Sequence, residues 1–401
     1  MNPLGDNIIF DFVFPNELHV VWSVMIVLYP YITGLVAGAF IISSLYHVFE
    51  RKELRSIARY SLVASLVFLG FATLPLLVHL GRPERAFNIM ITPHFTSAMA
   101  GFGYIYLMYM SILAIEVWFL FRGELVERAN ESQGIKKFIY TALALFDLTI
   151  NEETKAFDKK VITFFAAVGI PAACLLHGYV GFLFGSIKAN PWWSTPLMLP
   201  IFILSAIVSG ISVIIFKYFL VSYIQGFEIN DKCLKTLSSF LWGFMIIDVC
   251  MELLELLSIS YQQTGEWEIL SYLIYQKLWI PYLVIQLGIC SFIPFILLGI
   301  NTIFDLKRST ARACVFISSI LLLCQVLAMR WNVVIGGGMI SKSMRGFSSY
   351  FPGIFEKEGL FTAFIIFTCP FIILYLVDRI FPLFKFKGYD QETVALTTDE
   401  H

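Results

Sequence analysis

Long apolar stretches separated by short polar segments make up most of the chain from residue 20 to residue 381. A helix that crosses a bilayer needs about 20 consecutive, mostly apolar residues. Nine stretches meet this requirement, so the pattern predicts about nine transmembrane helices, with eight and ten as the neighbouring alternatives. The predicted spans are residues 20–49, 57–80, 97–121, 161–186, 195–223, 234–261, 278–303, 311–330 and 360–381.

Composition and charge support this fold class. The chain has 401 residues, of which 58% are hydrophobic and only 14% are charged, whereas a soluble domain carries about 25% charged residues. The chain is therefore predicted to be an all-α polytopic membrane protein. Its net charge of −1 argues against a nucleic-acid partner, which would require a basic face. The first nineteen residues contain Asp6, Asp11 and Glu17 but neither Lys nor Arg, so no cleavable signal peptide is expected.

The distribution of basic residues predicts an orientation. With the N-terminus outside, the inner segments hold 20 of the Lys and Arg residues and the outer segments hold 8. This excess on the inner side is what the positive-inside rule requires. We therefore expect the N-terminus outside and the C-terminus inside. The long inner segment 122–160 includes the stretch KKFIYTALALFDL, which is expected to form a helix at the membrane surface.

The sixth predicted span carries three acids. Asp248, Glu252 and Glu255 stand at positions i, i+4 and i+7 and therefore share one face of a helix. One acid near the bilayer centre costs about 2.5–3.5 kcal/mol on insertion scales, so the three should face the protein interior. A proton pathway, a structural hydrogen-bond network and a cation site all remain open as explanations.

Two segments far apart in the chain carry a resemblance to a known family. The first is HLGRPERAFNIM (residues 79–90), after which a new helix begins beside Ser97, and the second is RWNVVIGG (residues 330–337). The opening span adds Tyr29, Tyr31, Gly34 and Gly38. Together these segments resemble the NrfD/PsrC-like membrane subunits of polysulfide-reductase-type complexes. The chain is thereby also similar to the quinone-interacting subunits of alternative complex III and of the quinone reductase complex of sulfate reducers.

The resemblance implies an organisation into two four-helix bundles and one extra helix. Residues 20–186 would form the first bundle with a quinone site, and residues 187–330 the second bundle with the acidic sixth helix. Residues 331–359 would form an outer loop that docks a partner, through Arg330, Asn332, Gly336 and Gly337. Residues 360–381 would be the extra transmembrane helix, with 1–19 as an outer segment and 382–401 as an inner polar tail.

The predicted quinone site uses residues near the outer ends of the first four spans. A quinone head group needs hydrogen-bond donors, and its reduction needs protons that histidine can supply. The expected catalytic residues are His19, His79 and His177, and the expected quinone-binding residues are His19, His79, Arg82, Tyr104 and Tyr179. For each histidine, the alternative is an interfacial or capping role.

The expected function is a quinone-interacting membrane subunit of a respiratory oxidoreductase complex in the bacterial cytoplasmic membrane. It would exchange electrons between the quinone pool, menaquinone in particular, and an iron–sulfur partner outside, with coupled proton uptake or release. The complex could also contain a molybdopterin-type or multihaem cytochrome subunit. The seven cysteines form no cluster, so this chain is not expected to hold an iron–sulfur centre. Haem is not expected either, because no helix repeats a two-histidine spacing.

Two alternatives remain. A proton- or cation-coupled secondary transporter would use Asp248 as its ion-binding acid and would work without partners. A purely structural anchor for an outside enzyme would tolerate substitution of Asp248 or His79.

Overall fold

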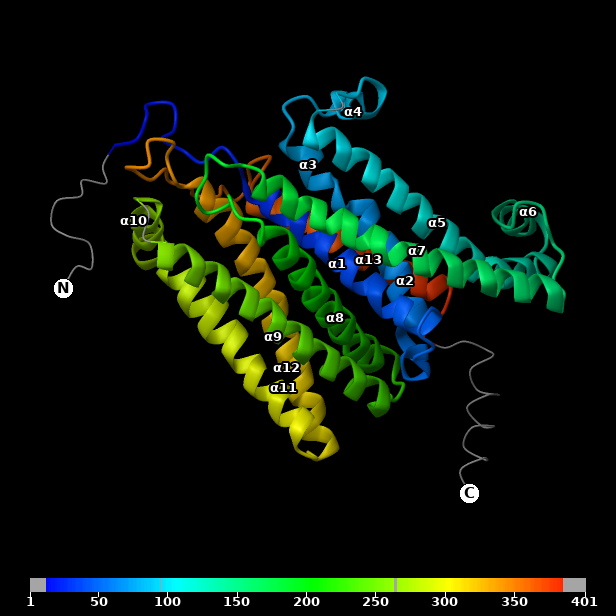
Figure 1. The fold of residues 1–401 in the computed structure, drawn as a ribbon. Helices are drawn as coiled ribbons and strands as arrows, with labels where there is room; N and C mark the ends of the chain where they lie inside the picture. The colour runs from blue at the N-terminus through cyan, green and yellow to red at the C-terminus, as the bar shows by residue number, and fades with distance from the viewer. Residues whose placement is uncertain (1–11, 95, 263–264, 385–401) are drawn as a thin grey trace.

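The computed structural model describes residues 12–94, 96–262 and 265–384. Regular structure in these ranges is helical, and extended pairing is limited to isolated β-bridges. The long helices run side by side in one elongated bundle (Figure 1). The prediction of an all-helical fold is confirmed.

Eight helical stretches in the described ranges are long and apolar enough to cross a membrane. A ninth long helix, α9 (Asp231–Gln262), packs against α8, α11 and α12 in the same bundle. The chain is therefore a multi-pass membrane protein of about nine helices. The other long elements are α1 (Val24–His47), α2 (Arg55–Ala72) followed by α3 (Leu74–His79), α5 (Ala98–Glu131), α7 (Glu152–Gly185), α8 (Met198–Gln225), the π-helical segment Trp279–Phe292 followed by α11 (Ile293–Ile303), α12 (Arg308–Trp331) and α13 (Leu360–Ile380).

Helix α1 lies at the centre of the bundle, and 94% of its most apolar stretch is buried. It contacts α2, α7, α8 and α12, which explains why it is apolar on all sides. Its closest approach is to α8, where a Cβ added at Gly38 would lie 2.4 Å from the Ala206 carbonyl oxygen and 2.6 Å from the Gly210 Cα. Small residues therefore allow these two backbones to meet, as is common in membrane bundles.

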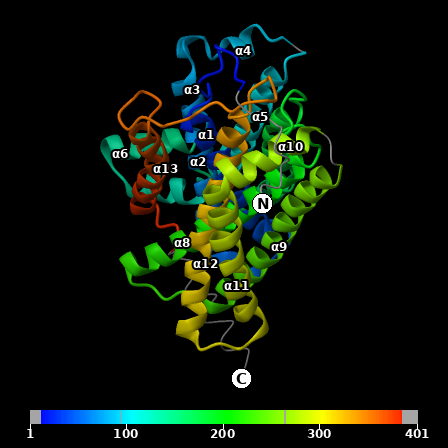
Figure 2. The ribbon, with the colours of Figure 1, turned by 90° about the vertical axis from the view of Figure 1, so that its left-hand side faces the viewer.

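Helices α5 and α7 are longer than the sequence predicts, at 34 residues each. A helix of this length spans about 51 Å, whereas the hydrocarbon core is about 30 Å thick. Both helices therefore extend beyond the core, where the short helix α6 (Gly134–Leu143) connects them. A helix is therefore present in segment 122–160 as expected, while its place at the membrane surface stays a prediction. Figure 2 shows α13 on one side of the bundle, where it packs on α2, and α9 on the other side.

Residues 337–359 fold back over the N-terminal segment. The backbone N–H of Phe12 donates to the Arg345 carbonyl (3.1 Å), and that of Val20 donates to the Ser349 carbonyl (3.2 Å). At this same end lie α4 (Asn88–Ile91) and α10 (Gly265–Tyr272), while α6 lies at the opposite end (Figure 1).

Candidate functional site

Helix α9 turns its acids into the protein. Asp248 is 1% exposed and Glu252 is 6% exposed, while Glu255 is half-buried. The expectation that these acids face the interior is confirmed. Since an isolated carboxylate is costly in hydrocarbon, their hydrogen-bond partners decide what the cluster can do.

Glu252 lies at the centre of a buried hydrogen-bond network formed by amide side chains. Its carboxylate accepts hydrogen bonds from Gln286 Nε2 (2.8 Å) and from Gln325 Nε2 (3.4 Å). Gln286 Oε1 in turn accepts from Asn332 Nδ2 (2.7 Å). The network thus joins α9 and α12 to two π-helical segments, Trp279–Phe292 and Asn332–Gly336. Departures from α-helical winding often mark functional sites.

A second buried group lies at the end of α12. Arg330 is fully buried, its guanidinium lies 3.8 Å from the centre of the Phe202 ring, and Nη2 donates to Ser205 Oγ (2.7 Å). Nη2 also lies 3.1 Å from His177 Nε2. Because a guanidinium can only donate, His177 Nε2 must accept, and the imidazole therefore carries its proton on Nδ1. Arg330 thus fixes the tautomer of a histidine that is itself fully buried.

Several polar atoms of these two groups have no hydrogen-bond partner among the described residues. They are both carboxylate oxygens of Asp248, one oxygen of Glu255, His177 Nδ1, Arg330 Nε, Gln325 Oε1 and Asn332 Oδ1. An unmatched buried polar group costs about 1–3 kcal/mol, so such a concentration is expected where protons or ligand atoms complete the bonding.

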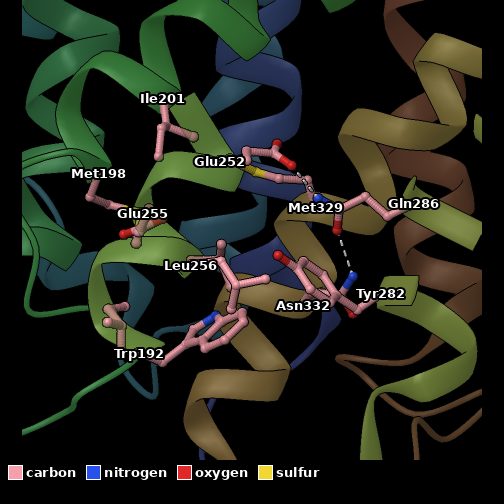
Figure 3. A pocket seen from close by; sticks show the side chains of 12 residues that line it. Trp192, Met198, Ile201, Glu252, Glu255, Leu256, Tyr282, Gln286, Met329 and Asn332 are labelled. Atoms are coloured by element: carbon pink, nitrogen blue, oxygen red, sulfur yellow. Dashed lines mark hydrogen bonds between the residues drawn. The ribbon is translucent and has the colours of Figure 1, made fainter. Parts of the chain in front are cut away.

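A small pocket with a cavity volume of about 40 Å³ opens beside this network. Its polar wall consists of Glu252, Glu255, Gln286 and Asn332. Figure 3 shows the tips of Glu252, Gln286 and Asn332 gathered on one side, with Trp192 across from them. The remaining lining residues are largely apolar or aromatic: Trp192, Met198, Ile201, Leu256, Ile259, Tyr282, Met329 and Val333. An apolar and aromatic lining with a few convergent polar groups is the chemistry typical of ligand-binding pockets.

The predicted quinone-site residues lie in separate surroundings. His19 is exposed beside Ser349, whereas His79 Nδ1 lies 2.6 Å from a Glu358 carboxylate oxygen. His177 alone of these residues joins the buried network. The structure therefore does not gather the three histidines into one cluster within its described residues.

The other residues predicted for this site serve the local backbone or face outward. Tyr104 donates to the Met90 carbonyl (3.0 Å), and Tyr179 donates to the Ala98 carbonyl (2.8 Å). Arg82 is exposed. The quinone assignment of these residues stays a prediction.

The residues predicted to dock a partner, Arg330, Asn332, Gly336 and Gly337, are all buried. A Cβ added at Gly337 would lie 2.3 Å from Trp193 Nε1, which donates to the Val333 carbonyl (2.6 Å). The glycines therefore allow close packing inside the chain. A partner that docks on this loop must contact other residues.

Sequence reasoning did not single out Gln286, Gln325 or Tyr282. Gln286 and Gln325 could have been recognised because each places an amide side chain in an otherwise apolar span, and a polar group in hydrocarbon needs a hydrogen-bond partner. All seven cysteines are free thiols. Within the described ranges, no three His, Cys, Asp or Glu residues form a group that could hold a metal ion.

Helices that span a membrane and enclose a buried polar network define a polytopic membrane protein with an internal site. Residues 14–341 match the family described as "Polysulphide reductase, NrfD", so the chain belongs to the NrfD family. It is 29% identical over 321 residues to a selenate reductase subunit of Mesobacillus selenatarsenatis, and the match covers 78% of this chain and 73% of that protein.

Two further relatives match shorter parts. A putative dimethyl sulfoxide reductase membrane subunit of Halobacterium salinarum is 27% identical over 222 residues, or 55% of this chain and 48% of that protein. Protein NrfD of Escherichia coli is 25% identical over 196 residues, or 48% of this chain and 58% of that protein. The recognition made from the sequence motifs is confirmed, and two of these relatives are named as reductase subunits.

Proposed function

We propose that this chain is the quinone-interacting membrane subunit of a respiratory reductase complex. The observation that carries the proposal is the pocket in which Glu252, Gln286 and Asn332 face Trp192 and Tyr282. Amide N–H groups can donate to a quinone carbonyl, and the aromatic rings provide flat apolar contact. The apolar residues Ile201, Leu256 and Ile259 suit the start of an isoprenoid tail.

The acids beside the pocket supply the proton chemistry. Reduction of a quinone to its quinol consumes two electrons and two protons, and quinol oxidation releases them. Glu252 lines the pocket, and Glu255 lies one helical turn further along α9. Asp248 lies one turn from Glu252 in the other direction, with both oxygens unmatched by described residues. Protons therefore pass between the head group and the protein through these carboxyl groups, with His177 as a further proton-carrying group nearby.

Electrons come from or go to an iron–sulfur partner subunit. The pocket lies at the end of the bundle that carries Trp192 and segment Asn332–Gly336. The count of basic residues assigns this end to the outside of the cytoplasmic membrane, so we place the partner there. The reductase names of two relatives support membership in such a complex. Menaquinone is the proposed quinone.

The test is binding of a menaquinone-head analogue to the complex purified with its partners, followed by fluorescence quenching. Gln286→Leu keeps the side-chain size but removes the amide, and it should weaken binding at least about tenfold, the effect of one hydrogen bond of about 1.4 kcal/mol. Glu252→Gln keeps the shape and should retain binding but slow turnover with quinone. His79→Ala is the comparison variant and should bind as wild type does.

Each other outcome changes the conclusion. Loss of binding in His79→Ala with normal binding in Gln286→Leu would show that the quinone head group binds at the residues predicted from the sequence and not in this pocket. Absence of saturable binding in the wild-type complex would refute the quinone function. Proton uptake by vesicles that contain this chain without any partner would then favour the transporter.

A further inference from the structure

Helix α6 exposes a complete apolar face. Ile135 is 80% exposed, Phe138 66%, Ile139 48% and Leu143 49%, and their spacing places them on one side of the helix. An exposed apolar face of this kind marks a surface that is covered in the assembled system.

The opposite side of α6 packs on α5 and fixes where the helix lies. Trp118 Nε1 donates to the Leu143 carbonyl (2.8 Å), and the Arg128 guanidinium lies 6.0 Å from the centre of the Tyr140 ring. Trp118 stands about 30 Å along α5 from its start at Ala98, a distance equal to the thickness of the hydrocarbon core. A span that enters the hydrocarbon core at Ala98 would bring Trp118, and with it the end of α6, to the opposite boundary of the core. Figure 1 shows α6 beside the end of α5, not in line with it.

The turn after α6 presents two more apolar side chains under backbone strain. Leu145 has a φ of 53° and Phe146 a φ of 61°, which is the left-handed region that such residues rarely adopt. Both side chains point away from the protein, at 67% and 68% exposure. Backbone N–H groups of Leu145 and Phe146 donate to the Ala142 and Thr141 carbonyls and hold this turn, and burial of both side chains in hydrocarbon would stabilise it further.

Basic residues accompany this apolar surface. Lys136 and Lys137 on α6 and Lys159 and Lys160 on α7 are all exposed, and none has an ion pair among the residues that the structure describes. Asp147, in contrast, is paired with Arg122 (2.6 Å). Lysines that flank a membrane-facing surface attract anionic head groups. A lipid surface therefore fits both the apolar and the charged parts of α6.

We propose that α6 and the turn at Leu145 and Phe146 lie in the head-group layer of the leaflet at this end of the bundle. The apolar face contacts acyl chains, and Lys136 and Lys137 contact anionic lipid. This membrane-surface anchor is independent of the quinone pocket, which lies at the other end of the bundle.

The first test uses lipid crosslinking of the full chain in nanodiscs. The photoreactive residue p-benzoylphenylalanine replaces Phe138 on the apolar face, or Tyr140 on the face toward α5 as the matched control. We expect a lipid adduct from position 138 and an adduct within the protein from position 140. Absence of a lipid adduct at 138 would overturn the proposal, as would an adduct to a separate protein at 138 in native membranes.

The second test addresses lipid charge. Nanodiscs that contain phosphatidylglycerol in phosphatidylcholine should give anionic adducts at position 138 enriched over their share of the lipid, by about fivefold for each lysine in contact. Lys136→Gln combined with Lys137→Gln should remove this enrichment and leave the total adduct yield unchanged. Equal enrichment in both proteins would exclude the lysines as the anionic contact.

Discussion

The crossing of α1 and α8 provides a quantitative test of the fold. A Cβ at Gly38 would lie 2.4 Å from the Ala206 carbonyl oxygen, while ordinary contacts begin at 3.4 Å. Gly38→Ala must therefore separate the two helices locally by about 1 Å. Overpacking of a well-packed core costs about 1–3 kcal/mol, and α1 cannot escape the clash because it is packed on α2, α7 and α12 as well.

Gly70→Ala on α2 is the matched control, because nothing lies within 4 Å of a Cβ built there. Both substitutions gain about 1 kcal/mol of helix propensity, so the difference between the two variants isolates the clash. The assay is the free energy of unfolding of the full chain in mild detergent, measured by titration with a denaturing detergent. Gly38→Ala should be less stable than Gly70→Ala by about 1–3 kcal/mol. Equal stability of the two variants would refute the close crossing.

Two further predictions concern the end of the bundle that carries the outer loop. Trp193→Phe removes the indole donor to the Val333 carbonyl (2.6 Å), and it should cost about 0.5–1.5 kcal/mol and speed amide exchange after residue 333. Burial favours the neutral form of Glu358, but hydrogen bonds from Ser23 and His79 outweigh it and hold the pKa of this carboxyl below its ordinary value of 4.5. Its stabilising contribution should therefore be complete above pH 4.5 and be lost as the pH falls below that value. The difference in unfolding midpoint between wild type and Glu358→Gln should shrink over that range, and a constant difference would contradict this account.

Secondary structure and the direction of the acids were predictable because each follows from local rules. An apolar stretch must satisfy its backbone within a helix when no water is present, so the spans follow from length and hydropathy alone. The cost of a carboxylate in hydrocarbon likewise required Asp248 and Glu252 to face inward, and both are buried. The lengths of α5 and α7 were underestimated because their ends leave the apolar core and carry charged residues.

The partners of those acids could not be predicted, because residues from α9, α12 and two π-helical segments meet only after the helices pack. Gln286 and Asn332 are 46 positions apart in the chain, yet they share a hydrogen bond of 2.7 Å. Histidines that were predicted to lie at the same depth also have different surroundings, since His79 contacts Glu358 whereas His177 contacts Arg330.

The sequence by itself determined the membrane class, the family and the helices, because hydropathy and motifs are properties of contiguous residues. The tertiary structure alone decided which polar side chains share a pocket, because that depends on the rotation and spacing of packed helices. Gly336 and Gly337 illustrate the difference. Their motif could be recognised in the sequence, but only the structure showed that these glycines pack against Leu278 and Trp193 inside the protein.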